Sequence, residues 1–131
     1  MLTSMVLEIK ESRMEPDITV VQLSGRLALG RAGQGLEGLV AGYVADGRLL
    51  VMLDLTRVDY IDSAGIGVLA MAAGQLKEAG GRLALVAGEG RVKALLHLTG
   101  LDEIMPLSET VEQAADRLRS SGTPPSATAQ P

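Results

Sequence analysis

The feature that most restricts the fold of this chain is an apolar run near its middle. Residues Leu49 to Leu55 are apolar except for Asp54, which is typical of a strand buried on both faces of a sheet. A second run of this kind covers Leu83 to Ala87. Between the two runs, apolar residues recur at helical spacing from Ile66 to Ala79, and Gly80-Gly81 ends that helix. A strand–helix–strand order predicts parallel strands joined by a helical crossover.

The N-terminal third adds two strands and a helix to this pattern. Met5 to Lys10 alternates like a half-exposed strand, and Ile18 to Leu23 is a compact β-branched strand. Residues 11–17, with a proline and several charges, suit the hairpin-like connection between them. From Leu36 to Val44 the apolar residues fall at i, i+3, i+4, i+7 and i+8, one stripe of a helix.

The C-terminal third predicts further short elements. A helix covers Arg91 to Leu98 and ends near Gly100, and Ile104-Met105 forms a last strand stopped by Pro106. Ser108 is the expected N-cap of a final helix, with Glu109 and Glu112 near its start. Residues 120–131 carry no charge and three prolines, so they are predicted to be a disordered tail.

These elements predict one α/β domain over residues 1–119. Its central sheet is expected to be mostly parallel, with four to five strands and about four helices. Apolar residues make up 47% of the chain, yet only Tyr43 and Tyr60 are aromatic, so aliphatic side chains must fill the core.

Composition argues against several classes of function. A net charge of −4 and the scarcity of aromatic residues argue against nucleic-acid binding. The chain has no cysteine, and His97 is its only histidine, so thiolate and clustered-imidazole metal sites are excluded. We expect no metal and no cofactor. Without a signal-peptide pattern, and with an uncharged interval at Ser63 to Leu76 too short for a span, we expect a cytoplasmic protein that does not insert into a membrane.

The first candidate site is the segment from Asp59 to Gly67, between a buried strand and a helix. In a parallel sheet this places it at the carboxyl edge, where binding sites concentrate. Ser63 could cap the helix, and a phosphate on its hydroxyl would meet free N–H groups and the positive end of the helix dipole. Gly65 and Gly67 keep side chains away from a docking partner. The alternative is that Ser63 only caps a helix and the glycines only allow close packing.

Four short segments together resemble the STAS domains, the anti-sigma factor antagonist family. The segment Ile61-Asp62-Ser63-Ala64-Gly65-Ile66-Gly67 after the central strand is similar to the family signature. So are Leu23-Ser24-Gly25-Arg26-Leu27, Gly80-Gly81-Arg82-Leu83 and Leu98-Thr99-Gly100-Leu101. Each segment alone is weak, but they occur in the order and spacing of the family over about residues 5 to 119.

The resemblance implies a phosphorylation switch rather than an enzyme. In the family, the serine after the motif aspartate, here Ser63, is phosphorylated by a partner kinase that is also an anti-sigma factor. The unphosphorylated form binds that anti-sigma factor and frees the sigma factor, and a PP2C-type phosphatase resets the switch. A phosphate adds about −1.5 to −2 charges beside Asp62, so we expect it to abolish partner binding while leaving the fold nearly unchanged. The expected partner-binding residues are Gly25, Arg26, Ala28, Asp59, Asp62, Ser63, Ala64, Gly65, Ile66 and Gly67.

The early loop departs from the family pattern in two places. Ala28 stands where phosphorylated antagonists usually carry an acid after Gly-x-Leu, and Arg26 replaces a frequent acid. Because that loop helps to contact the kinase in the family, the departures bear on which partner is bound. Ala64 stands where a second hydroxyl residue is common. Other STAS domains are transporter-associated subunits or scaffolds that are never phosphorylated, and this remains the main alternative.

Three further motifs carry weaker hypotheses. Gly33-Gln34-Gly35-Leu36-Glu37-Gly38 matches GxGxxG but does not directly follow a strand, so we interpret it as a loop before the first helix rather than a dinucleotide site. Ser63 with His97 and Asp102 could form a hydrolase triad, but Ile61 occupies the position where a nucleophile elbow needs glycine. Arg91 and Lys93 could contact a partner or form a solvated face.

Overall fold

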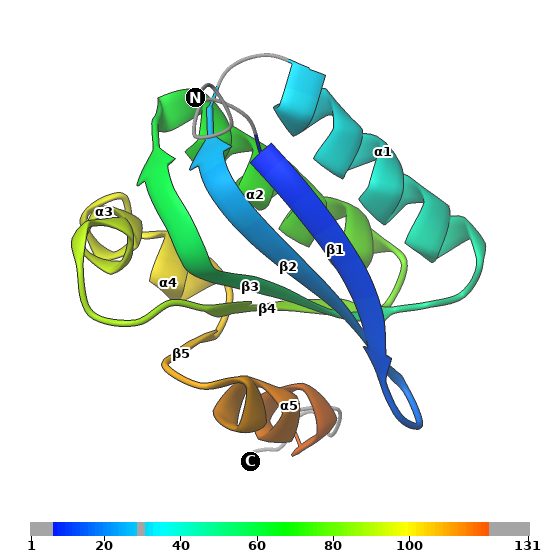
Figure 1. The fold of residues 1–131 in the computed structure, drawn as a ribbon. Helices are drawn as coiled ribbons and strands as arrows, with labels where there is room; N and C mark the ends of the chain where they lie inside the picture. The colour runs from blue at the N-terminus through cyan, green and yellow to red at the C-terminus, as the bar shows by residue number, and fades with distance from the viewer. Residues whose placement is uncertain (1–6, 29–30, 121–131) are drawn as a thin grey trace.

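The structure, a computed structural model, describes residues 7–28 and 31–120 as a five-stranded sheet covered by helices (Figure 1). The strands lie in the order β1-β2-β3-β4-β5; β1 pairs with β2 antiparallel, and every other pair is parallel. This confirms the α/β class and the mostly parallel sheet. The elements are β1 Leu7–Met14, β2 Ile18–Leu27, α1 Arg31–Ala45, β3 Leu50–Ile61, α2 Ser63–Glu78, β4 Arg82–Val86, α3 Arg91–Leu98, α4 Leu101–Ile104, β5 Leu107–Ser108 and α5 Val111–Ser120.

The sheet has an apolar cluster on each face because side chains alternate along its buried strands. On one face, Val51 and Leu53 of β3 belong to a cluster with Leu36 of α1, Leu69 of α2 and Leu96 of α3. On the other face, Met52 of β3 lies in a smaller cluster with residues of α5, which covers that side alone among the described helices (Figure 1). The continuous apolar run of β3 therefore has the two-sided burial that the sequence predicted.

Strand β3 is much longer than its neighbour β4, and this difference in length shapes the carboxyl edge. Residues 50–54 of β3 pair with β4, whereas the rest of β3 pairs only with β2. Two register shifts in the β2–β3 ladder place an extra residue on β3 each time. At the first, the buried carboxylate of Asp54 accepts hydrogen bonds from the amide and hydroxyl of Thr56, at 3.0 and 2.8 Å.

The glycines after α2 end that helix as predicted. Gly80 has φ +88, a left-handed conformation that favours glycine. A Cβ on Gly81 would lie 2.3 Å from the carbonyl oxygen of Leu49, so only glycine lets the chain enter β4 at this point.

Three predictions for the N-terminal third need correction. β2 continues to Leu27, beyond the predicted end at Leu23, because it pairs with the long β3. β1 continues to Met14, beyond the predicted end at Lys10, and the connection is only residues 15–17; residues 5 and 6 lie outside the described residues. The GxGxxG segment is not a loop, because Gly33, Gly35 and Gly38 all lie within α1. A Cβ on Gly35 or Gly38 would have nothing within 4 Å, so these two glycines are not required by close packing.

In the C-terminal third, the observed elements differ more from those predicted from the sequence. Ile104 ends the short helix α4, and the last strand follows Pro106 instead of preceding it. Ser108 lies buried in that strand and is not the N-cap; the Thr110 hydroxyl accepts a 3.1 Å hydrogen bond from the Gln113 amide. The short α4 raises the helices within residues 7–28 and 31–120 to five, one more than the approximate number predicted. Of the predicted tail, Ser120 is the last residue of α5 and the remainder lies outside the described residues. No described helix has the length and apolar character needed to cross a membrane.

Candidate functional site

The carboxyl edge of the sheet brings together the ends of β2 and β3 and the start of α2. Leu27 of β2 pairs with Ile61 of β3, and the Asp62 amide donates a 3.3 Å hydrogen bond to the Leu27 carbonyl oxygen. The two predicted partner-binding segments, residues 25–28 and 59–67, are therefore neighbours in space. Gly25, at a register shift of β2, has φ +101, which explains why glycine occupies that position.

Ser63 is the first residue of α2 and its side chain is exposed. The expectation that Ser63 caps the helix is wrong: Asp62 is the N-cap, and its Oδ1 accepts a 2.9 Å hydrogen bond from the Gly65 amide. No hydrogen bond involves the Ser63 hydroxyl within the described part of the chain. The hydroxyl is thus accessible at the positive end of a helix and has no capping role to lose.

The two glycines of the motif have different structural roles. A Cβ on Gly65 would lie 2.3 Å from the Leu27 carbonyl oxygen and 2.8 Å from a side-chain carbon of Ile61. Gly65 therefore lets α2 begin directly against β2. A Cβ on Gly67 would meet nothing within 4 Å, so this exposed position is open. Both Ala64 and Ile66 are half-buried, and Ile66 packs against the main core.

Arg26 forms a pair with Tyr60 that sequence reasoning missed. The two residues are partners in the β2–β3 ladder, and the guanidinium carbon of Arg26 lies 3.9 Å from the centre of the Tyr60 ring. This is the geometry of a cation–π interaction. Asp59 is the extra, exposed residue of β3 at the adjacent register shift. Since the two bulges decide which residues face each other, the pair could not be found by counting along the sequence.

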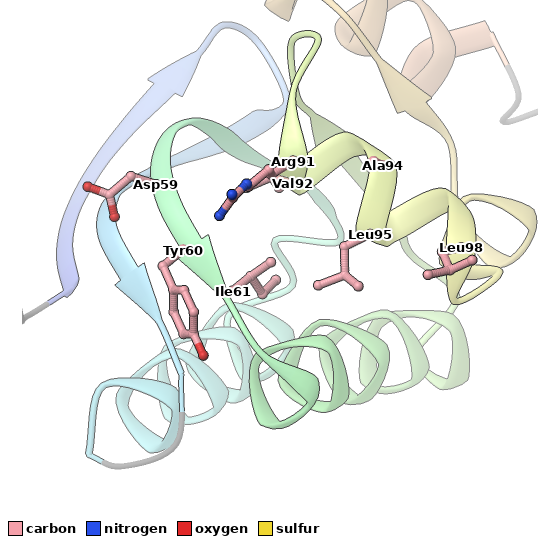
Figure 2. A pocket seen from close by; sticks show the side chains of 8 residues that line it. All are labelled: Asp59, Tyr60, Ile61, Arg91, Val92, Ala94, Leu95 and Leu98. Carbon is pink, nitrogen blue, oxygen red and sulfur yellow. The ribbon is translucent and has the colours of Figure 1, made fainter.

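A groove of about 320 Å³ separates the end of β3 from α3. Figure 2 shows Ile61 of β3 and Leu95 of α3 pointing toward each other across it, with Leu98 farther along α3. Arg91 extends from the start of α3 toward β3, whereas Asp59 and Tyr60 point to the other side of the strand. The groove is lined by Asp59, Tyr60, Ile61, Arg91, Val92, Ala94, Leu95 and Leu98. In the sequence, two signals pointed to this surface: Arg91, named as a possible partner contact, and Leu98, which follows Leu95 at helical spacing.

Of the remaining candidates from the sequence, Arg91 lines this groove, whereas His97, Asp102 and Lys93 do not. His97 does not contact Ser63 in the described structure; its Nδ1 lies 2.9 Å from Asp102 Oδ2 at the other end of α3. This hydrogen bond, together with the carboxylate charge, raises the pKa of His97 above its ordinary 6.5. Lys93 is engaged with Glu89 and Glu109, each at 2.8 Å, whereas Arg91 lies at the groove. A hydrolase triad is therefore not assembled among the described residues.

Comparison with known proteins identifies the class to which this fold and edge belong. The family model of the STAS domain matches residues 10–114. The chain therefore belongs to the STAS domain family, as its motifs indicated.

Individual relatives fit this assignment. The chain is 38% identical over 80 residues to BtrV of Bordetella bronchiseptica, which is provisionally described as an anti-sigma factor antagonist; the match covers 61% of this chain and 69% of BtrV. It is 31% identical over 101 residues to the anti-sigma-B factor antagonist of Listeria monocytogenes, covering 77% of this chain and 86% of that protein. The crystal structure of an anti-sigma factor antagonist from Mycobacterium paratuberculosis has a TM-score of 0.74 at 27% identity, covering 86% of this chain and 94% of that one.

Proposed function

We propose that this chain is an anti-sigma factor antagonist whose binding to an anti-sigma factor is controlled by a phosphate on Ser63. The observation that carries the proposal is the exposed hydroxyl of Ser63 at the first position of α2, which forms no hydrogen bond with another described residue. The relatives that bear the antagonist name support the role. In this role the chain is a binding module, and the chemistry of phosphate transfer belongs to its partners.

The start of α2 is suited to hold a phosphate without unfolding. The first N–H groups of a helix have no partners within the helix, and the helix dipole favours an anion there. Asp62 uses the Gly65 amide, so the earlier amides of this turn remain as donors near residue 63. A phosphate at this position therefore gains local interactions instead of disturbing the core, and the fold should change little.

The same phosphate is unfavourable for a protein docked on this edge. It brings about −1.5 to −2 charges next to Asp62 and close in sequence to the exposed Asp59. A surface that fits the neutral serine would meet both added bulk and like charge. In the proposed cycle, an anti-sigma factor serine kinase binds the unphosphorylated form and releases the phosphorylated form, and a PP2C-type phosphatase restores binding.

The test uses the full chain and each purified kinase-type anti-sigma factor encoded in the source genome. Incubation of the wild-type chain with ATP and its cognate kinase should add a single phosphate, located at Ser63 by mass spectrometry. Ser63→Ala should bind that kinase like the wild type, and Ser63→Asp should bind at least about tenfold more weakly. Ser12→Asp is the matched control, because it places the same charge on an exposed serine in the middle of β1 and should bind within about twofold of the wild type.

Two results would contradict the proposal. One is equal binding of Ser63→Ala and Ser63→Asp to the cognate kinase. The other is the absence of phosphate transfer to Ser63 from every kinase tested, which would favour a STAS domain that acts as a scaffold or transporter-associated subunit.

A further inference from the structure

We infer that the groove between β3 and α3, together with the Arg26–Tyr60 pair on the other side of β3, binds an acidic amphipathic segment of the anti-sigma partner. Apolar side chains of that segment fill the groove, and a carboxylate of the segment binds the Arg26 guanidinium. This inference rests on the proposed function and names the chemistry of its binding surface.

The groove joins the exposed Leu98 to apolar residues at the border of the main core. Leu98 is 82% exposed at the end of α3, although it lies two residues after the fully buried Leu96. Ile61, Val92 and Leu95 form the apolar wall beside it. An exposed leucine alone is ordinary, but apolar residues from two elements that together line a concave surface are typical of a protein-binding site.

The charges around the groove select an acidic ligand. The chain as a whole carries a net charge of −4, yet both Arg26 and Arg91 lack a carboxylate partner among residues 7–28 and 31–120. Lys93, by contrast, binds two glutamates, and Arg119 binds Asp17. The one acid lining the groove, Asp59, points with Tyr60 to the other side of β3 (Figure 2), and it forms no ion pair with Arg26 or Arg91 among the described residues.

Stacking on Tyr60 prepares Arg26 to bind a carboxylate. The ring contact at 3.9 Å holds the guanidinium in one position while using no hydrogen-bond donor. The planar group can therefore present paired N–H donors to a carboxylate, with less conformational entropy lost on binding. Tyr60 is itself 40% exposed, which leaves the stacked pair open to a partner.

The groove also lies next to the proposed switch. Residues 59–61 of β3 form one wall, and the chain passes from Ile61 through Asp62 directly to Ser63. A phosphate on Ser63 would stand at the end of this surface and repel an acidic segment within a screening length of about 8 Å at physiological salt. A phosphate on Ser63 therefore opposes the binding of an acidic segment by charge repulsion as well as by its bulk.

The test measures affinity of the full chain for the cognate kinase-type anti-sigma factor by calorimetry at two salt concentrations. Arg26→Glu and Leu98→Asp should each weaken binding at least about tenfold, and Tyr60→Leu should weaken it less than Arg26→Glu. Arg48→Glu and Ile104→Asp are matched controls: Arg48 precedes β3 at the opposite edge, and Ile104 is 67% exposed outside this groove. Both should bind within about twofold of the wild type. Thermal unfolding of each variant shows whether its fold is intact.

The outcomes separate this inference from the proposed function. If Ser63→Asp loses binding while Arg26→Glu and Leu98→Asp retain it, the switch stands and the groove is not the binding surface. If the controls lose as much affinity as the test variants, the inference also fails. If Leu98→Asp leaves kinase binding intact but turns a dimer into a monomer in sedimentation, the occupant is a second copy of this chain. If the wild-type chain binds no kinase-type anti-sigma factor of its genome, both the proposed function and this inference are overturned.

Discussion

At the scale of single residues, the residues at the start of α2 have different roles. Asp62 satisfies a helix amide and Gly65 permits contact between α2 and the end of β2, so both positions serve the structure. Ser63 lies between them with an exposed side chain and no hydrogen bond of its own in the described chain. A modification at residue 63 therefore acts on the surface while its two neighbours keep the helix in place.

The two glycines of the motif should respond in opposite ways to alanine. In Gly65→Ala the new methyl group would lie 2.3 Å from the Leu27 carbonyl oxygen, so the helix must shift, and we expect a loss of roughly 1–3 kcal/mol in unfolding free energy. In Gly67→Ala the methyl group meets no atom within 4 Å, and the higher helix propensity of alanine should add about 0.5–1 kcal/mol. Urea unfolding followed by circular dichroism measures both; similar effects of the two substitutions would contradict the packing described here.

This contrast also shows what a sequence can predict at the residue scale. The motif placed Ser63 correctly at the start of a helix, because the change from an apolar run to helical spacing is visible in the residues. It did not distinguish Gly65 from Gly67, nor Ser63 from Asp62 as the cap. The nearest atom that distinguishes the glycines is the Leu27 carbonyl oxygen of β2, more than thirty residues earlier, and its approach depends on how the helix docks on the sheet.

At the scale of elements, α3 and α4 are joined by a surface pair between His97 and Asp102. Its Nδ1–Oδ2 distance is 2.9 Å, and Asp102 raises the pKa of His97 by hydrogen bonding and then by charge. Because folding raises this pKa, the protonated pair contributes its full stability below about pH 6.5, and the contribution is lost as the pH rises through the folded-state pKa.

His97 is the only histidine, so its titration can be followed without ambiguity by NMR. We expect the wild-type chain to show a His97 pKa above 6.5 and Asp102→Asn to lower it toward that value. Glu103→Gln is the matched control, since Glu103 contributes only a smaller charge effect and its removal should lower the pKa less. An unchanged pKa in Asp102→Asn would show that the pair does not form in solution.

Element prediction succeeded where a pattern was long and failed where it was short. The apolar stripe from Leu36 to Val44 and the run from Leu49 to Leu55 each contain enough residues to define a period, and both elements are present. Ile104-Met105 offered only two residues, and the helix α4 and the strand after Pro106 take their structure from pairing with β4 and packing on α3. β3 was predicted too short because its exposed residues Thr56 and Arg57 interrupt the apolar pattern.

At the scale of the whole molecule, packed leucines and surface leucines should differ sharply in their effect on stability. Leu118 of α5 is 1% exposed in the cluster on one face of the sheet, so Leu118→Ala should lower the unfolding free energy by about 2–4 kcal/mol. Leu98 is 82% exposed, and Leu98→Ala should change it by less than about 0.5 kcal/mol. Chemical denaturation of both variants tests this comparison, and a large destabilisation by Leu98→Ala would mean that this side chain is packed in solution.

The extension of β3 beyond β4 has a consequence for how such a protein diversifies. Residues 56, 57, 59 and 60 are exposed on this overhang, whereas the layers that hold the molecule together are built from other positions. After gene duplication, mutations on the overhang could alter recognition at little thermodynamic cost. Two copies in one cell could then bind different partners long before their folds diverged.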